Sequence, residues 1–397
     1  MNKEKRTSKI SYLIETIMFI TYAFFAVNWI AGSTLTPEIM NHFGLTEFSQ
    51  ATLISNAVTV AKIIGNFAAA SVLNKLYPKK SIGLGSLLIV LGSVLAIFAP
   101  SYLIFVIGRF IMGFGGALYV VYFSPVVIEY FSKEDRPVIN SLNTVCYNVG
   151  SILALILVSP VLNYFNNWKY SLLFFAGISF ILFILWLIFG RDFEISDKSK
   201  GKYSLKDGLK EPIAWIMPLS YFGHLTLYMV MLNIFPVSDL SPIDPKNIST
   251  LFAIGGVVGT IVAIVLSKKL KKRVPIIKIC TLIFSVMAIF MLRAQNGLLA
   301  SILAFLMGVL MYVPLTSFVT IPQELPEMTP ARLTQIMSIY WAVVYLLETI
   351  AFYIVGVLID KFSYEVGLYF AVILSFSFFI GSFFLPETSK YKNKSNE

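Results

Sequence analysis

The sequence predicts an all-α membrane protein with 12 transmembrane helices. Apolar stretches long enough to cross a bilayer recur about twelve times, and short loops separate them. Hydrophobic residues make up 57% of the 397 residues and charged residues only 13%, which is too few charges for the surface of a soluble protein of this size. The stretches are continuous and much longer than the roughly ten alternating residues of a barrel strand, which indicates helices.

Hydropathy places the helices in order, with glycine, proline and charged residues marking their ends. The predicted spans are 11–33, 49–73, 81–100, 102–128, 138–164, 169–190, 212–236, 249–267, 274–292, 297–320, 333–359 and 365–385. The first span follows a basic segment, as in a signal peptide, but it is longer and lacks a small-residue cleavage site, so we expect it to be retained. Cys146 and Cys280 fall inside spans, which indicates neither a disulfide nor a metal site.

Lysine and arginine gather in alternate loops. With the N-terminus in the cytoplasm, the loops on that side hold about six times as many positive residues as the opposite loops, which keep only Lys169, Lys246, Arg293 and Lys361. The positive-inside rule therefore predicts a multi-pass protein of the inner or plasma membrane with both termini cytoplasmic. The formal net charge of +10 reflects this topology and the lipid headgroups, and it gives no support for nucleic-acid binding.

The chain divides at its longest hydrophilic loop, residues 191–211. This division predicts a six-helix bundle over 1–190, a cytoplasmic central loop, and a second six-helix bundle over 212–397 with a short cytoplasmic tail. A weak internal repeat supports it, because four residues of the first half recur at a constant offset in the second: Phe110, Met112, Gly113 and Glu129 match Phe305, Met307, Gly308 and Glu324. Such repeats in helical membrane proteins usually form two bundles around a central pathway, so we expect a polar cavity between them.

Several motifs resemble the major facilitator superfamily. The loop from Ala70 to Lys80 resembles the signature of that family after its second helix, although the signature's glycine and aspartate are absent. Arg109, within the run from Gly108 to Gly116, resembles the arginine motif of the fourth helix. The resemblance implies two pseudo-symmetric bundles, and it implies gating or structural roles for six loop residues: Asn74, Lys75, Lys79, Lys80, Glu129 and Arg136. Leu385–Thr388 resembles the ending of sugar porters, and the antiporter motif is only hinted at between Gly150 and Pro160.

Five ionisable residues fall deep inside predicted spans: Glu15, Lys62, Arg109, His224 and Glu348. A charge at such a depth costs several kcal/mol unless it faces protein or water, which makes each residue a candidate for a functional site.

Three of the candidate substrate-binding residues lie in the first half. Arg109 has a planar guanidinium that suits a carboxylate, nitrate or phosphate, and the alternative is a structural arginine that bonds helix ends. Lys62 lies in the middle of the second span, with Asn66 one turn later on the same face. Its ammonium can pair with a substrate anion, or with Glu15 as a structural ion pair.

Glu348 lies on an aromatic face of the eleventh span. Trp341, Tyr345, Glu348 and Phe352 recur at helical spacing, and a carboxyl group in such surroundings readily takes up a proton. We predict that Glu348 carries a coupling proton and that Trp341 and Tyr345 contact substrate, although an aromatic face is also typical of packing. Glu15, nearer the cytoplasmic end of its span, is a second candidate for coupling unless it snorkels to the interface.

A similar face runs along the seventh span through Tyr221, His224 and Tyr228. His224 is a candidate for substrate binding or proton coupling, and the alternative is a packed histidine. Tyr312 and Thr316 of the tenth span supply an aromatic ring and a hydroxyl group that could orient a small solute.

These observations predict a secondary transporter that moves a small polar solute by alternating access, possibly coupled to protons. The solute is expected to be an organic or inorganic anion, or a zwitterion, since Glu15 and Glu348 balance the two cations. The alternative is a drug or lipid exporter of the same fold, which acts as a proton antiporter. No metalloprotease, nucleophile-elbow or P-loop motif is present, so we expect neither an enzyme nor a cofactor. The expected partners are the solute, a coupling ion and membrane lipids, and we expect a monomer.

Overall fold

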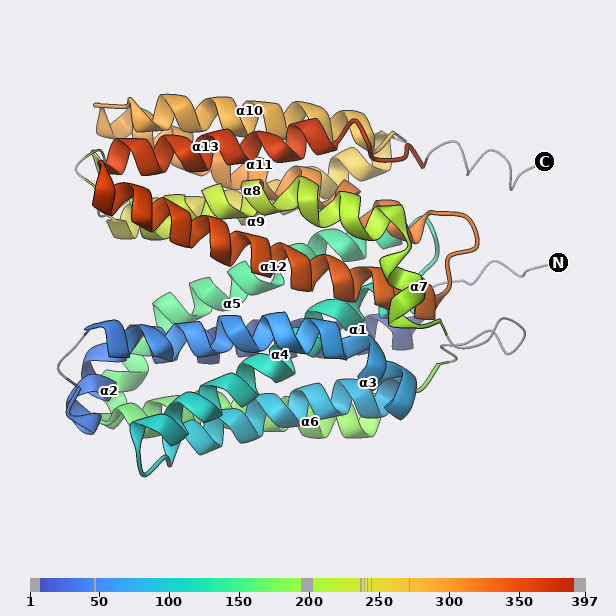
Figure 1. Ribbon diagram of the computed structural model, residues 1–397. Coiled ribbons are helices and arrows are strands. Elements are labelled where there is room, and N and C mark those ends of the chain that lie inside the picture. The colour runs from blue at the N-terminus through green and yellow to red at the C-terminus, as the bar shows by residue number, and fades with distance from the viewer. Residues whose placement is uncertain are drawn as a thin grey trace. The chain divides into compact units, whose positions relative to one another are not determined.

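The computed structural model describes residues 8–45, 48–193, 203–235, 238, 240, 242–243, 245–270 and 272–388. These residues form helices and turns, with no strand among them (Figure 1). Eleven helices of the described chain are long and apolar enough to cross a membrane. The predicted all-α membrane fold is confirmed.

The helices follow the predicted spans closely. Their bounds are α1 Lys9–Thr34, α2 Thr36–Phe43, α3 Phe48–Ile97, α4 Tyr102–Tyr130, α5 Arg136–Phe165, α6 Trp168–Phe189, α7 Leu205–Leu209, α8 Pro212–Asn233, α9 Pro245–Lys269, α10 Val274–Leu292, α11 Gly297–Gln323, α12 Pro330–Lys361 and α13 Tyr364–Gly381. The short helices α2 and α7 were not predicted.

Helix α3 contains the second and third predicted spans, which explains why eleven apolar helices account for twelve predicted crossings. The two spans meet at Tyr77, whose φ of 64° and ψ of 163° are not helical. Pro78 follows, and a proline disfavours the α conformation in the residue before it. The basic loop after the second span is therefore a sharp kink within one long element.

The chain forms two compact units, each described here by itself. The first unit comprises Met1–Ser132, Cys146–Leu205 and Thr329–Ala342, and the second comprises Lys133–Val145, Lys206–Met328 and Val343–Glu397. Helices α5 and α12 are thus divided, because each contributes its first part to one unit and the rest to the other. The predicted boundaries at 190 and 212 stay a prediction, and residues 194–202 of the central loop lie outside the described residues.

The same pattern of helix packing occurs within each unit. In the first unit α4 packs against α3, and α6 packs against α1 and α3. In the second unit α11 packs against α9 and α10, and α13 packs against α8 and α10. The repeated glycines allow this close approach: a Cβ at Gly113 would lie 2.8 Å from Cα of Val58, and one at Gly308 would lie 3.0 Å from Cα of Phe252.

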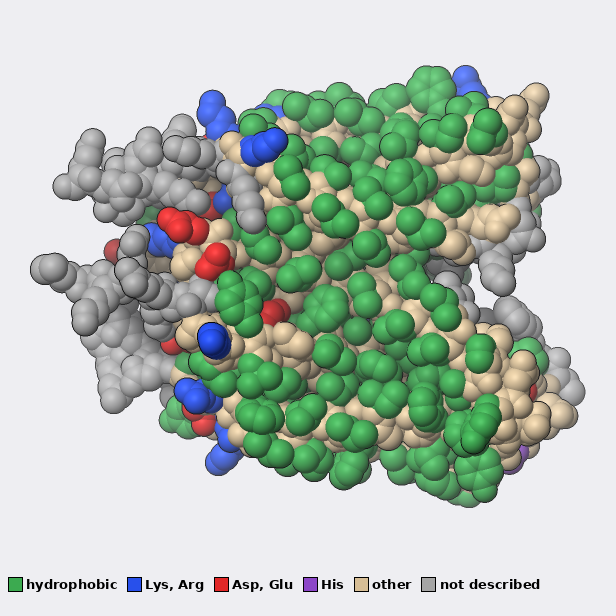
Figure 2. Space-filling model, turned by 180° about the vertical axis from the view of Figure 1, so that it is seen from behind, with side chains coloured by type: hydrophobic (Ala, Val, Ile, Leu, Met, Phe, Trp, Pro, Cys, Tyr) green, Lys and Arg blue, Asp and Glu red, His purple; other side chains and the backbone are tan. Residues whose placement is uncertain are grey.

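The surface is apolar over most of the face that Figure 2 shows, and charged side chains gather near one edge of it. Large apolar side chains are exposed on many helices, among them Val60, Phe180, Ile279 and Leu298. A surface with this much exposed apolar area is stable in lipid and not in water.

Candidate functional site

Arg109 ties three helices of the first unit together. From α4, its Nε donates to the carbonyl oxygen of Ile54 on α3 at 2.9 Å. Its Nη1 and Nη2 donate to the carbonyl oxygens of Asn28 and Trp29 on α1, at 2.9 and 2.8 Å. Gly32 makes room for the guanidinium, because a Cβ there would lie 2.5 Å from Nη1. These contacts link α1, α3 and α4, and direct contact of Arg109 with a substrate stays a prediction.

Lys62 and Asn66 lie one turn apart on α3, and both are buried. The Nζ atom of Lys62 lies 4.9 Å from the ring centroid of Trp29, a cation–π distance. Tyr147 of α5 packs edge-on against the same indole, with the ring centroids 5.6 Å apart. We call Trp29, Lys62, Asn66 and Tyr147 the α1–α3 cluster, and all four residues belong to the first unit.

The side chain of Asn66 is buried without a hydrogen-bond partner in the described chain. Its side chain is 0% exposed, and within the described chain neither its amide nitrogen nor its amide oxygen has a hydrogen-bond partner. On the opposite side of α3 the apolar side chains of Leu53, Val60 and Ile64 are exposed. The Lys62–Asn66 face therefore points away from the apolar side of the helix that meets lipid.

The two predicted coupling carboxylates lie in different units. Glu15 of α1 is buried in the first unit, and Glu348 of α12 is buried in the second. Tyr345 lies one turn before Glu348 on the same helix. Trp341, one turn earlier, falls in the part of α12 that belongs to the first unit, where its ring packs against Tyr340 at 4.7 Å between centroids.

His224 is enclosed by aromatic rings of the second unit. The centroid of its imidazole lies 4.1 Å from that of Phe284, 5.2 Å from that of Phe378 and 6.0 Å from that of Tyr221. It is fully buried, and in the described chain neither ring nitrogen has a hydrogen-bond partner. The contacts favour a neutral packing residue at the junction of α8, α10 and α13, and its predicted roles in binding and coupling stay predictions.

Tyr228 and Tyr312 are also buried in the second unit. Their ring centroids lie 6.3 Å apart, and the ring of Tyr228 meets that of Phe252 edge-on at 5.9 Å. Thr316 lies one turn after Tyr312 on α11, and its hydroxyl group is 3.0 Å from that of Ser141 on α5. The structure thus brings Thr316 to a helix contact, while its predicted role in substrate binding is untested.

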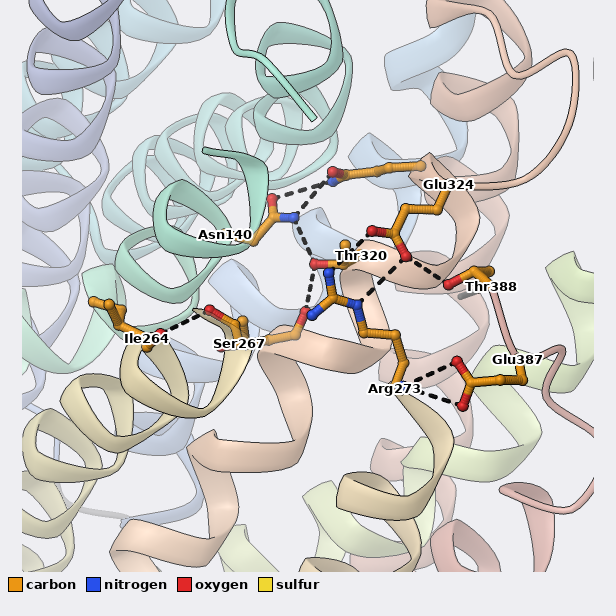
Figure 3. Close-up of polar contacts among 10 residues, drawn as sticks. Asn140, Ile264, Ser267, Arg273, Thr320, Glu324, Glu387 and Thr388 are labelled. Carbon is orange, nitrogen blue, oxygen red and sulfur yellow. Dashed lines mark hydrogen bonds and ion pairs between the residues drawn. The ribbon is translucent and has the colours of Figure 1, made fainter. Parts of the chain in front are cut away.

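A buried amide pair joins α5 and α11 in the second unit (Figure 3). Asn140 Nδ2 donates to Gln323 Oε1 at 2.9 Å, and Gln323 Nε2 donates back to Asn140 Oδ1 at 3.1 Å. Asn140 also donates to the hydroxyl oxygen of Thr320 at 2.9 Å. The contact is uncharged and reciprocal, and the sequence did not predict it because the two amides are far apart along the chain.

Gln323 is followed by Glu324, which belongs to a charged network (Figure 3). Arg273 Nη2 lies 3.0 Å from Glu324 Oε1, its Nε donates to Oε2 at 3.4 Å, and both side chains are buried. Thr388 donates its hydroxyl proton to the same carboxylate at 2.5 Å. Glu387 accepts from the backbone amides of Arg273 and Val274 at 3.0 and 3.1 Å.

The same capping arrangement occurs in the first unit. Asp192, after α6, accepts from the backbone amide of Lys79 at 2.8 Å, and Trp186 donates to the carbonyl oxygen of Lys79 at 2.9 Å. Asp192 and Lys79 precede Glu387 and Val274 by the same number of residues. The constant offset of the internal repeat was therefore the signal in the sequence that could have predicted a role for Asp192.

The remaining predicted loop residues lie near this end of the helices. Lys75 and Lys80 are exposed, while Asn74, Glu129 and Arg136 are half-buried. Their gating roles stay predictions.

The predicted site residues divide between the two units. Glu15, Lys62, Asn66, Arg109 and Trp341 belong to the first, and Tyr221, His224, Tyr228, Tyr312, Thr316, Tyr345 and Glu348 belong to the second. The shared cavity predicted for them stays a prediction. The described residues contain no group of three His, Cys, Asp or Glu side chains that could hold a metal ion.

The chain is similar to known proteins in sequence and in structure. A family model described as Major Facilitator Superfamily matches residues 17–346. An uncharacterized protein of Campylobacter jejuni is 32% identical over 309 residues, which cover 75% of this chain and 95% of the relative. The crystal structure of FucP, a transporter of that superfamily in the outward conformation, has a TM-score of 0.75 at 16% identity and covers 95% of this chain and 99% of its own. The proton:xylose symporter XylE has a TM-score of 0.74 at 14% identity, with coverages of 98% and 99%.

Proposed function

Because the chain belongs to the major facilitator superfamily, we propose that it transports a small organic anion together with protons. The family and the fold are those of membrane transporters, which confirms the expectations of a secondary transporter and of a protein that is not an enzyme. The proposal adds the anion, the coupling proton, and a place in the inner or plasma membrane with both termini cytoplasmic.

The buried ammonium of Lys62 carries the proposal of an anion. Lys62 is 3% exposed within a membrane-spanning helix, beside Trp29 and one turn from the amide of Asn66, which has no hydrogen-bond partner in the part of the chain that the structure describes. A lysine is costly at such a depth, and where one occurs it usually marks a substrate pathway. A neutral sugar does not require this cation, whereas a carboxylate does. Xylose, the solute named for XylE, is therefore a poorer model for this substrate than an acid.

Arg109 supports the same site indirectly. Its guanidinium holds the backbone of α1 at Asn28 and Trp29, and the indole of Trp29 then lies against Lys62. We assign Arg109 the role of a positioning residue for this contact.

Glu348 is the proposed proton carrier. It is 7% exposed on α12, one turn from Tyr345, where burial disfavours a permanent negative charge. Entry of an anion together with a proton keeps the net charge moved across the membrane small.

The test is uptake by purified protein in liposomes with an acidic exterior. We expect accumulation of one class among small carboxylates, amino acids, sugars and hydrophobic drugs, and we expect it to be the carboxylates. Lys62→Met should abolish uptake, and Lys62→Arg should retain part of it because the charge remains.

Lys278→Met is the matched control, since Lys278 also lies in a membrane-spanning helix, with its Nζ 3.7 Å from the ring centroid of Phe383. That variant should transport normally. Uptake of neutral sugars, or export of drugs with no effect of Lys62→Met, would contradict the proposal, and the second result would favour the exporter.

A further inference from the structure

The amide of Asn66, which has no hydrogen-bond partner among the described residues, indicates a property of the substrate beyond its charge. A carboxamide has two N–H donors and an oxygen acceptor, and leaving such a group buried without partners destabilises the folded protein. Asn140 in the second unit shows how a buried amide is usually paired, because the amide of Gln323 forms hydrogen bonds with both its nitrogen and its oxygen. Within the described chain Asn66 has no such partner, although it is fully buried.

The chemistry of the missing partner follows from the amide. A carboxylate has only acceptors, so it can satisfy Nδ2 and leaves Oδ1 without a donor. A hydroxyl group can accept from Nδ2 and can also donate to Oδ1. The amide therefore matches an alcohol better than it matches an acid.

The neighbouring residues match an acid. The Lys62 ammonium, one helical turn away, attracts a carboxylate, and side chains four residues apart on a helix lie about 5–6 Å from each other at Cβ. The indole of Trp29 offers an apolar surface beside the ammonium.

We propose that the α1–α3 cluster binds a hydroxylated carboxylate, that is, a hydroxy acid or sugar acid, with its carboxylate on Lys62 and a hydroxyl group on Asn66. This inference rests on the proposed function and narrows its substrate class. It places recognition of the hydroxyl group within the first unit and assigns it to one side chain.

The binding test uses purified protein and two sets of probes matched in carbon number. One set is glycerate, propionate and glycerol, and the other is gluconate, hexanoate and sorbitol. A ligand that binds the folded state raises the midpoint of thermal unfolding, which gives relative affinities. In at least one set, we expect the hydroxy acid to bind about tenfold more tightly than the acid without hydroxyl groups, which is the effect of one good hydrogen bond.

Two variants separate this inference from the proposed function. Asn66→Leu should remove the preference for the hydroxy acid and leave both acids with equal affinity, while Lys62→Met should abolish binding of both. Equal binding of the two acids to the wild-type protein, or an unchanged preference in Asn66→Leu, overturns the inference and leaves the proposed anion transport intact. If no acid binds, or if the polyol binds as tightly as the hydroxy acid, the proposed function fails as well.

A second measurement requires no ligand. Asn66→Leu should raise the midpoint of thermal unfolding of the ligand-free protein, because it removes a buried polar group that has no partner. Asn140→Leu is the matched control and should lower the midpoint, because it removes the hydrogen-bond partner of the Gln323 amide. A decrease for Asn66→Leu like that for Asn140→Leu would show that Asn66 has a partner within the protein, and it would overturn the inference.

Discussion

The Arg109 guanidinium donates from each of its three nitrogen atoms to a backbone carbonyl oxygen. The acceptors belong to two other helices, so one side chain sets the relative height of α1, α3 and α4. A lysine has a single nitrogen and cannot reach three diverging acceptors. At the residue scale, Arg109 therefore acts on the α1–α3 cluster through the backbone of Trp29.

We expect Arg109→Lys to lower the free energy of unfolding by about 2 kcal/mol or more, because charge-assisted hydrogen bonds are lost. Uptake should fall at least tenfold. Thermal unfolding in detergent and transport in liposomes check the two effects. Arg293→Lys is the control, because Arg293 is exposed and its Nε donates to the hydroxyl oxygen of Tyr369, and it should change neither. Full uptake by Arg109→Lys would show that the three-carbonyl contact is dispensable.

Glu348→Gln keeps the volume of the side chain and removes its titration. Accumulation driven by a pH gradient should be lost, whereas exchange of internal for external substrate, which needs no net proton movement, should persist. His224→Phe should keep accumulation, because Phe284, Phe378 and Tyr221 surround the imidazole as packing neighbours. If Glu348→Gln still accumulated substrate and His224→Phe did not, His224 would be the proton carrier and Glu348 a packing residue.

At the scale of elements, the break in α3 concentrates strain at one residue. Tyr77 has a φ of 64° with an extended ψ, a region that glycine occupies freely and that costs other residues about 1–3 kcal/mol. The backbone beside it is held from outside, because Asp192 and Trp186 bond the amide and carbonyl of Lys79. The loop is thus fixed by α6 and by the residues after it.

Tyr77→Gly should raise the midpoint of thermal unfolding, because glycine adopts this conformation without strain. Tyr77→Ala is the control and should not raise it, since alanine retains the Cβ. Equal midpoints for the two variants would mean that the backbone conformation at Tyr77 carries no cost.

A buried ion pair links the residue before α10 to the residue after α11. Arg273→Met should destabilise the protein by about 3–5 kcal/mol, because Glu324 loses its cation while it remains buried. The double variant with Glu324→Met should recover most of this loss, since no charge is then buried alone. Denaturation of the single and double variants measures the recovery, and a double variant as unstable as Arg273→Met would disprove the explanation.

At the scale of the whole molecule, the two units share two helices. The first parts of α5 and α12 belong to one unit and their remainders to the other, so each helix carries covalent continuity between units. The buried pair of Asn140 and Gln323 fixes the first part of α5 to α11 within the second unit.

The predicted topology is tested with single cysteines. Lys133→Cys should react with a membrane-impermeant maleimide only after the cells are opened, and Lys169→Cys should react from outside intact cells. Both variants need Cys146→Ser and Cys280→Ser backgrounds to remove the native thiols. The reverse labelling pattern would invert the orientation of the chain.

The sequence by itself determined the membrane class, the family and nearly every helix. Hydropathy is a sum over neighbouring residues, so it located α10 and α6 to within a residue and showed that Lys62 and Glu348 lie deep in their spans. It also predicted the basic loop that proved to be the kink at Tyr77. These features depend only on the types of residues and on their order over short stretches of the sequence.

Only the tertiary structure decided which polar group meets which. The carbonyl oxygens that Arg109 bonds, the rings around His224 and the amide that Asn140 pairs with come from segments distant along the chain. One sequence pattern, a polar residue inside an apolar helix, thus produced a hydrogen-bonded arginine, an enclosed histidine and, among the described residues, an Asn66 without a hydrogen-bond partner. The physical reason is that a hydrogen bond forms only when the donor and the acceptor are placed to within a few tenths of an ångström, and helix packing sets that placement.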